Sequence, residues 1–223
     1  MDAINVVIKF FQDCGLFIYP SLAIMALGLA IAIERFIFLS KSRSENRKMW
    51  DGILPMLQGG KLQQVYGITG KSDAAISVIV HNGLSRLQST RRREDIDAAM
   101  EEGMMEIVPR LEKRTHYIAT FANVITLVGL LGTISGLIHA FTAVAQVNPA
   151  EKAELLSASI SVAMNNTFFA LTVAIPFLLI HAFLSARTTD IVDSLEAAKI
   201  TFLNLIGKMH GDTKASAEQR ETH

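Results

Sequence analysis

The sequence contains very little cysteine and no surplus of positive or negative charge, and each of these shortages excludes a class of function. Its single cysteine, Cys14, excludes an intrachain disulfide framework and a metal site built from several cysteines, and we interpret it as a small apolar filler. The 21 Lys and Arg residues are balanced by 21 Asp and Glu residues. The chain therefore lacks the basic excess with which nucleic-acid-binding proteins neutralise phosphates, and we expect no nucleic acid among its partners.

Long apolar stretches are what the sequence has instead. Half of its residues (50%) are hydrophobic although 19% are charged, so the two kinds must be segregated along the chain. Residues 14–39, 117–147 and 155–186 each exceed the roughly 20 apolar residues that cross a hydrocarbon core. The sequence therefore predicts an all-α integral membrane protein with three transmembrane helices. The second and third stretches are longer than a bilayer requires, and we expect them to project into the cytoplasm as continuous helices.

The basic residues near the ends of these stretches predict the orientation. The first stretch runs into Glu34 and Arg35 rather than into a small-residue cleavage site, so we interpret it as a permanent span and not as a signal peptide. Basic residues follow the first stretch, precede the second and follow the third: Lys41, Arg43, Arg47 and Lys48; Arg110, Lys113 and Arg114; and Arg187. Because such clusters remain in the cytoplasm, we expect a periplasmic N-terminus and a cytoplasmic C-terminus in a bacterial inner membrane.

The remaining segments are expected to be helical or polar. Residues 1–13 place apolar side chains on one helical face and predict a periplasmic interfacial helix. Residues 40–116 predict a cytoplasmic helical segment, in which the run 91–95 indicates a helix start because its acids suit the positive end of a helix dipole. The other predicted segments are a periplasmic turn at 148–154, a cytoplasmic helix at 187–210 and a polar, disordered tail at 211–223.

Small and polar residues mark the second and third spans. Gly129, Gly132 and Gly136 recur at a spacing of three to four residues, which lets helices approach closely, and we expect them to shape contacts between subunits. Thr133 and Thr167 lie equally far from Ala150 in the outer turn, each roughly 25 Å of helix away. Two antiparallel helices therefore place these hydroxyls at one level in the bilayer.

Two further polar residues, Asn166 and Thr126, lie in the same helices. In hydrocarbon such groups face a protein interior or a hydrated path, which favours an ion path lined by Thr133 and Thr167. The alternative is that each threonine hydroxyl bonds back to a carbonyl three or four residues earlier in its own helix. Both interpretations stay open at this stage.

Acidic residues are absent from the second and third spans. His139 and His181 lie towards the ends of these spans and are interpreted as interface or packing residues. No Ser/His, Asp/Asp or His/Glu constellation assembles in the spans, so we expect no catalytic residues, no metal, no cofactor and no enzyme activity. If the protein conducts protons, the proton-binding carboxylate must come from a partner.

Two segments carry a resemblance to a known family. The stretches LVGLLGTISGLIHAF (127–141) and ISVAMNNTFFALTVAIPFLLI (160–180) resemble the paired signatures of the MotA/TolQ/ExbB proton-channel family. AIERFIFL (32–39) agrees with the family's charged pair, here Glu34 and Arg35, at the cytoplasmic end of the first span. Three spans and a long cytoplasmic segment are similar to the TolQ/ExbB branch. The chain departs from the pattern at three positions: Thr126 replaces a proline, Ser135 a tryptophan and Val162 a glutamate.

The resemblance implies a homopentameric ring around the single transmembrane helices of a dimeric ExbD/TolR-like partner that carries an essential intramembrane aspartate. It implies that Thr133 and Thr167 line the interior of the ring, supported by Asn166 and Thr126. A TonB- or TolA-like protein would receive the work, and membrane lipid would surround the ring. The expected ion is H+. Sodium coupling, and a non-conducting scaffold that assembles an envelope complex, are the alternatives.

Overall fold

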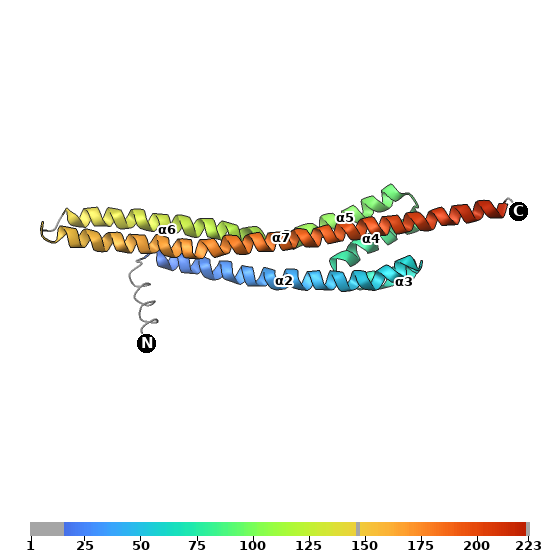
Figure 1. Ribbon diagram of the computed structural model, residues 1–223, viewed down its shortest axis with the longest axis horizontal. Helices are drawn as coiled ribbons and strands as arrows, with labels where there is room; N and C mark the ends of the chain where they lie inside the picture. Colours follow the sequence, from blue (N-terminus) through green and yellow to red (C-terminus); the bar gives the residue numbers. More distant parts are fainter. Residues whose placement is uncertain (1–15, 146–147, 222–223) are drawn as a thin grey trace, which may run out of the picture. The chain divides into compact units, whose positions relative to one another are not determined.

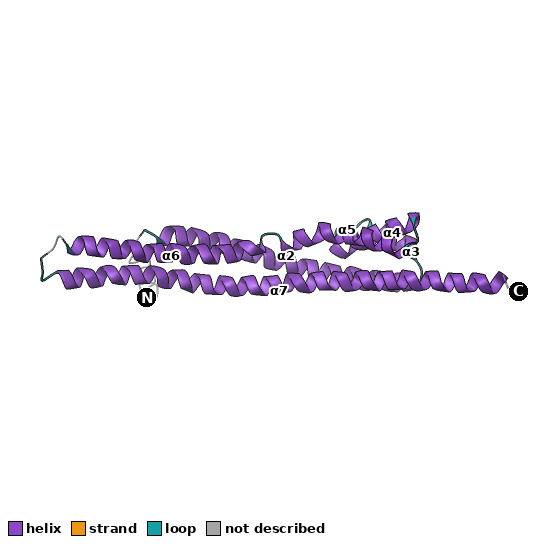
Figure 2. Cartoon of the chain, turned by 90° about the horizontal axis from the view of Figure 1, so that it is seen from above, coloured by secondary structure: helices purple, strands orange, loops and turns teal. Residues whose placement is uncertain are grey.

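The computed structural model of the chain describes residues 16–145 and 148–221, and these residues form helices joined by short loops without a strand (Figure 2). The predicted all-α class is therefore confirmed. The interfacial helix expected at residues 1–13 lies outside the described residues. Figure 1 shows the order of the helices, which are α2 (Ile18–Gln58), α3 (Leu62–Thr69), α4 (Ala75–Ser89), α5 (Arg93–Glu112), α6 (Thr115–Val144) and α7 (Lys152–Glu221).

Three helical stretches are long and apolar enough to cross a membrane, judged by length and composition. They are Ile18–Gln58, Arg93–Val144 and Lys152–Met209, and each overlaps most of one of the three predicted spans. The chain is therefore a multi-pass membrane protein with three apolar helices. α5 begins at Arg93, inside the run 91–95 that predicts a helix start, and carries two acids in its first turn.

The helix bounds differ from the expected ones in two ways. α2 continues beyond residue 39 to Gln58, and α7, which includes the helix expected at 187–210, runs unbroken to Glu221 through residues for which the sequence predicts disorder. Ala, Glu, Lys and Gln are strong helix formers, so a change from apolar to polar composition does not end a helix. α6, in contrast, begins at Thr115 because Arg114 has a φ of 66° and breaks the α-helical path from α5.

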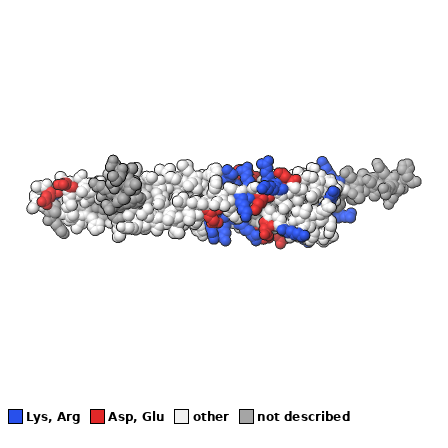
Figure 3. Space-filling model, turned by 90° about the horizontal axis from the view of Figure 1, so that it is seen from below, with Lys and Arg blue, Asp and Glu red and all other residues white. Residues whose placement is uncertain are grey.

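The chain divides into two compact units. The first contains residues 1–35 and 114–184, and the second contains residues 36–113 and 185–223. In the described part of the first unit, Asp, Glu, Lys and Arg occur only at its two ends: Glu34, Arg35 and Arg114 at one, and Glu151, Lys152 and Glu154 at the other. Figure 3 shows most of the Lys, Arg, Asp and Glu side chains over the second unit and a small group of acidic side chains at one end of the first unit.

The second unit has a core of its own, formed where α3, α4 and α5 pack with parts of α2 and α7. Met100 and Phe202 are fully buried there, and both lie against Gly83 of α4. The first turn of α4 is capped from a distance, since Asn46 Oδ1 accepts a hydrogen bond of 3.1 Å from the buried N–H of Ile76. These contacts all lie within the second unit.

Candidate functional site

The candidate site begins with the close packing of α6 on the first half of α7, which run side by side in Figures 1 and 2. Glycines of α6 permit this approach. A Cβ added at any of three glycines would crowd a side chain of α7: Ala170 for Gly129, Asn166 for Gly132, and Ala163 for Gly136. The sequence predicts that these glycines shape contacts between subunits; in the structure they face α7 of the same chain.

Thr167 connects the two helices through its hydroxyl. Its Oγ1 donates a hydrogen bond of 3.1 Å to the backbone carbonyl of Gly129, and the side chain is half-buried. This bond uses the donor of the hydroxyl and leaves oxygen lone pairs that can still accept a hydrogen bond. The local back-bonding considered as an alternative is therefore not what Thr167 does.

Thr133 and Thr126, the two threonines of α6 that the sequence assigns to the ion path, bond within their own helix. Thr133 Oγ1 donates to the carbonyl of Leu130 at 2.6 Å, and Thr126 Oγ1 donates to the carbonyl of Ala122 at 2.9 Å. Both hydroxyls thus bond within their own helix, as threonines often do where no other acceptor is close. Each oxygen keeps its accepting capacity, so the hydroxyls remain able to interact with a polar species beside α6.

Asn166 is the most deeply buried of the polar residues predicted to line the ion path. Its side chain is 4% exposed, and its Oδ1 is buried without a hydrogen-bond partner in the protein. Leaving a buried amide oxygen unpaired costs about 1–3 kcal/mol, so this acceptor calls for a donor from outside the chain. Asn166 lies against Gly132, and Thr167 lies against Gly129, so these groups and Thr133 share a level to within about one helical turn of ~5.4 Å.

An ion pair lies at the end of the first unit where α6 begins. Glu34 Oε2 accepts from Arg114 Nη1 at 3.2 Å, and both side chains are about half exposed. Glu34 also interacts electrostatically with its neighbour Arg35, the partner expected from the sequence, and Arg35 is buried at 3% exposure. The sequence indicates Arg114 only as a member of the basic cluster. Its ion pair with Glu34 was not predicted, because the two residues lie far apart in the sequence.

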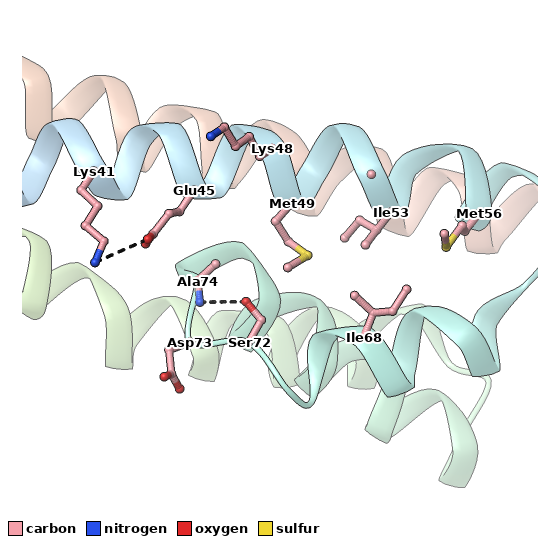
Figure 4. Close-up of a pocket in the computed structure, with 11 residues that line it drawn as sticks. Lys41, Glu45, Lys48, Met49, Ile53, Met56, Ile68, Ser72, Asp73 and Ala74 are labelled. Atoms are coloured by element: carbon pink, nitrogen blue, oxygen red, sulfur yellow. Dashed lines mark hydrogen bonds and ion pairs between the residues drawn. The ribbon is translucent and has the colours of Figure 1, made fainter.

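A second concave site lies in the second unit and was not indicated by any motif. Figure 4 shows it between α2 and the α3–α4 connection, with Met49, Ile53, Met56 and Ile68 on its walls. Its volume is about 610 Å³, and charged side chains, including the Lys41–Glu45 pair at 3.7 Å, lie at its edge. Among the described residues, no group of three or more His, Cys, Asp or Glu side chains is placed to hold a metal ion.

Comparison with known proteins assigns the hairpin to a family. The model of the MotA/TolQ/ExbB proton channel family matches residues 71–197, which is more than half of the chain and includes both signature stretches. A putative biopolymer transport protein, an ExbB homolog from Methanothermobacter thermautotrophicus, is 26% identical over 196 residues, covering 86% of this chain and 68% of the relative.

Two further relatives are of the same kind. The Tol-Pal system protein TolQ from Haemophilus influenzae is 29% identical over 178 residues, which is 74% of this chain and 76% of the relative. A putative ExbB-like biopolymer transport protein from Synechocystis is 26% identical over 166 residues, covering 74% of this chain and 78% of the relative. The chain therefore belongs to the MotA/TolQ/ExbB proton channel family, in its TolQ/ExbB-like branch.

Proposed function

We propose that the chain is the ring-forming subunit of an ion-driven motor in the bacterial inner membrane, which uses the proton motive force to energise an envelope or transport process. As a member of a proton-channel family it is a channel subunit and not an enzyme. The observation that carries the finer proposal is the polar cluster of Thr133, Asn166 and Thr167 in two apolar spans, residues 117–147 and 155–186, that contain no carboxylate of their own.

The chemistry of this cluster requires a second protein. Hydroxyl and amide groups can pass or orient a hydrogen bond, but at neutral pH they do not hold a proton as a carboxylate does. The proton-binding group would therefore be an intramembrane aspartate of a single-span ExbD/TolR-like partner. A homopentamer of this chain would surround that partner, with the N-terminus periplasmic, the C-terminus cytoplasmic and lipid outside.

The names of the relatives support the kind of work involved. One relative is named for the Tol-Pal system and two for biopolymer transport. By analogy, the motion of the partner would be passed to a TonB- or TolA-like protein. Protons are the proposed ion, and sodium is the alternative because the cluster contains an amide in addition to hydroxyls.

Thr167→Val tests this proposal. Valine keeps the shape of the side chain and removes the hydroxyl together with its bond to Gly129, a loss of about 0.5–1.5 kcal/mol that should leave assembly intact. Thr172→Val is the matched control, because Thr172 lies in the same helix, is exposed and bonds back to the carbonyl of Phe168 at 2.8 Å.

The assay is ion flux in liposomes that contain the chain and its partner. We expect Thr167→Val to lower the flux at least tenfold and Thr172→Val to leave it near the wild-type rate, while size-exclusion chromatography shows the same assembly for both. Wild-type flux in the Thr167→Val variant would exclude the hydroxyl path. Repeating the measurement without sodium at a fixed pH gradient distinguishes H+ from Na+ coupling.

A non-conducting scaffold is the second candidate. It is favoured by the bonds of Thr133 and Thr126 to their own helix, which are what threonines make when they serve only packing. A scaffold predicts no flux above that of empty liposomes, whether the partner is present or absent.

A further inference from the structure

A pocket of about 400 Å³ lies within the first unit, beside the polar cluster. Its walls are the face of α6 from Gly132 to His139, the face of α7 from Ser159 to Asn166, and the residues Leu16 and Phe17 that precede α2. All of these residues belong to one chain. Val162, which replaces the glutamate of the family pattern, is one of its lining residues.

The polar groups on the wall of the pocket are suited to water. Ser135, His139 and Ser159 can each donate and accept a hydrogen bond, and the pocket is also lined by Asn166, whose buried Oδ1 has no partner in the protein. An amide oxygen without a protein donor is satisfied by the O–H of water. At roughly 30 Å³ for each molecule, the volume accommodates on the order of ten waters.

The position of the pocket relates it to the hydroxyl level. Ser135 and His139 follow Thr133 in α6, towards the end of that helix at Val144, and Ser159 precedes Thr167 in α7. The pocket therefore extends from the hydroxyl level in the direction of the α6–α7 turn. Asn166, which directly precedes Thr167, forms its end at the hydroxyl level.

We propose that this pocket is a water-binding site inside each subunit and that it gives a hydrated ion access to Thr167 from the side of the α6–α7 turn. The second half of the proposal rests on the proposed ion-driven function, whereas the first half does not. Hydration is measured by the reactivity of an introduced thiol, because a thiol reacts as its thiolate and ionises only where water reaches it.

The experiment uses the full chain with its partner in membrane vesicles, in a Cys14→Ser background that removes the native thiol. Ser159→Cys and Ser135→Cys place a thiol in the pocket. Ile138→Cys is the control, since Ile138 adjoins His139 in α6, is 61% exposed and is not a pocket residue. The probe is a membrane-impermeant, cationic methanethiosulfonate applied to the side of the α6–α7 turn.

Both pocket thiols should react at least tenfold faster than Cys at position 138, and adding Asn166→Leu should slow the reaction of Ser159→Cys at least tenfold. Rates no faster than that of Ile138→Cys would overturn the proposal and indicate a lipid or protein occupant.

Labelling of Ser159→Cys should also lower ion flux at least tenfold. Fast labelling with unchanged flux would overturn the access route alone, and the failure of the proposed function would be seen separately, as absence of flux in the unlabelled protein.

Discussion

Gly129→Ala should destabilise the protein, because the added methyl has no space between α6 and α7. It would overlap Ala170 Cβ and lie 3.4 Å from two backbone atoms, the carbonyl oxygen of Asn166 and the Cα of Thr167. Backbone atoms of a packed helix cannot move aside as the end of a flexible side chain can. Overpacking of this kind costs about 1–3 kcal/mol, which exceeds the ~1 kcal/mol that alanine gains over glycine in helix propensity. We therefore expect a net loss of up to about 2 kcal/mol.

A second substitution shows whether the clash itself is the cause. Ala170→Gly removes the methyl that the new one would meet, and alone it should cost about 1 kcal/mol through lower helix propensity. If the two methyls compete for one space, the double variant Gly129→Ala with Ala170→Gly should lose less unfolding free energy than the two single variants lose together, by at least ~1 kcal/mol.

The matched control is Gly52→Ala, which places the same methyl in the interior of α2 where nothing lies within 4 Å. It should stabilise the protein by about 0.5–1 kcal/mol. Thermal unfolding of the purified protein in detergent measures all four variants, at roughly 2–4 °C of Tm for each kcal/mol. A Tm for Gly129→Ala at or above that of the wild type would refute the packing of the two helices through this glycine.

The features that follow from local pattern were predicted correctly. Span length and hydropathy indicate three apolar helices, and the regular rise of a helix places Thr133 and Thr167 at one level without knowledge of the fold. The glycine stripe shows why a pattern has limits. Contacts within a chain and contacts between subunits both need small residues, so only the structure reveals that Gly129 and Gly136 face α7 of the same chain.

The remaining features depend on contacts between distant residues. Arg114 adopts a left-handed conformation without being glycine, and it pairs with Glu34 from another helix. No spacing rule connects these two residues, so the start of α6 and the partner of Glu34 were not predictable from the sequence.

Two further predictions concern the second unit. Asn46→Leu should lower the free energy of unfolding by about 1–3 kcal/mol, because it leaves the buried N–H of Ile76 without an acceptor. Asn46→Asp keeps the acceptor and should cost less. Equal losses of stability in the two variants, measured by thermal unfolding, would contradict the capping role of Asn46. Lys199 Nζ lies 2.5 Å from Glu101 Oε2 and 3.1 Å from Asp97 Oδ1. Burial lowers the pKa of Lys199, but these two carboxylates raise it more, so its pKa in the folded protein lies above the ordinary 10.5. The stabilisation is therefore complete below about pH 10.5 and is lost as the pH rises through the folded pKa. Arginine stays charged in this range, so the Tm of Lys199→Arg should fall less than that of the wild type between pH 9 and pH ~12. If the Tm of the two proteins falls by the same amount over this range, the titration of Lys199 is contradicted.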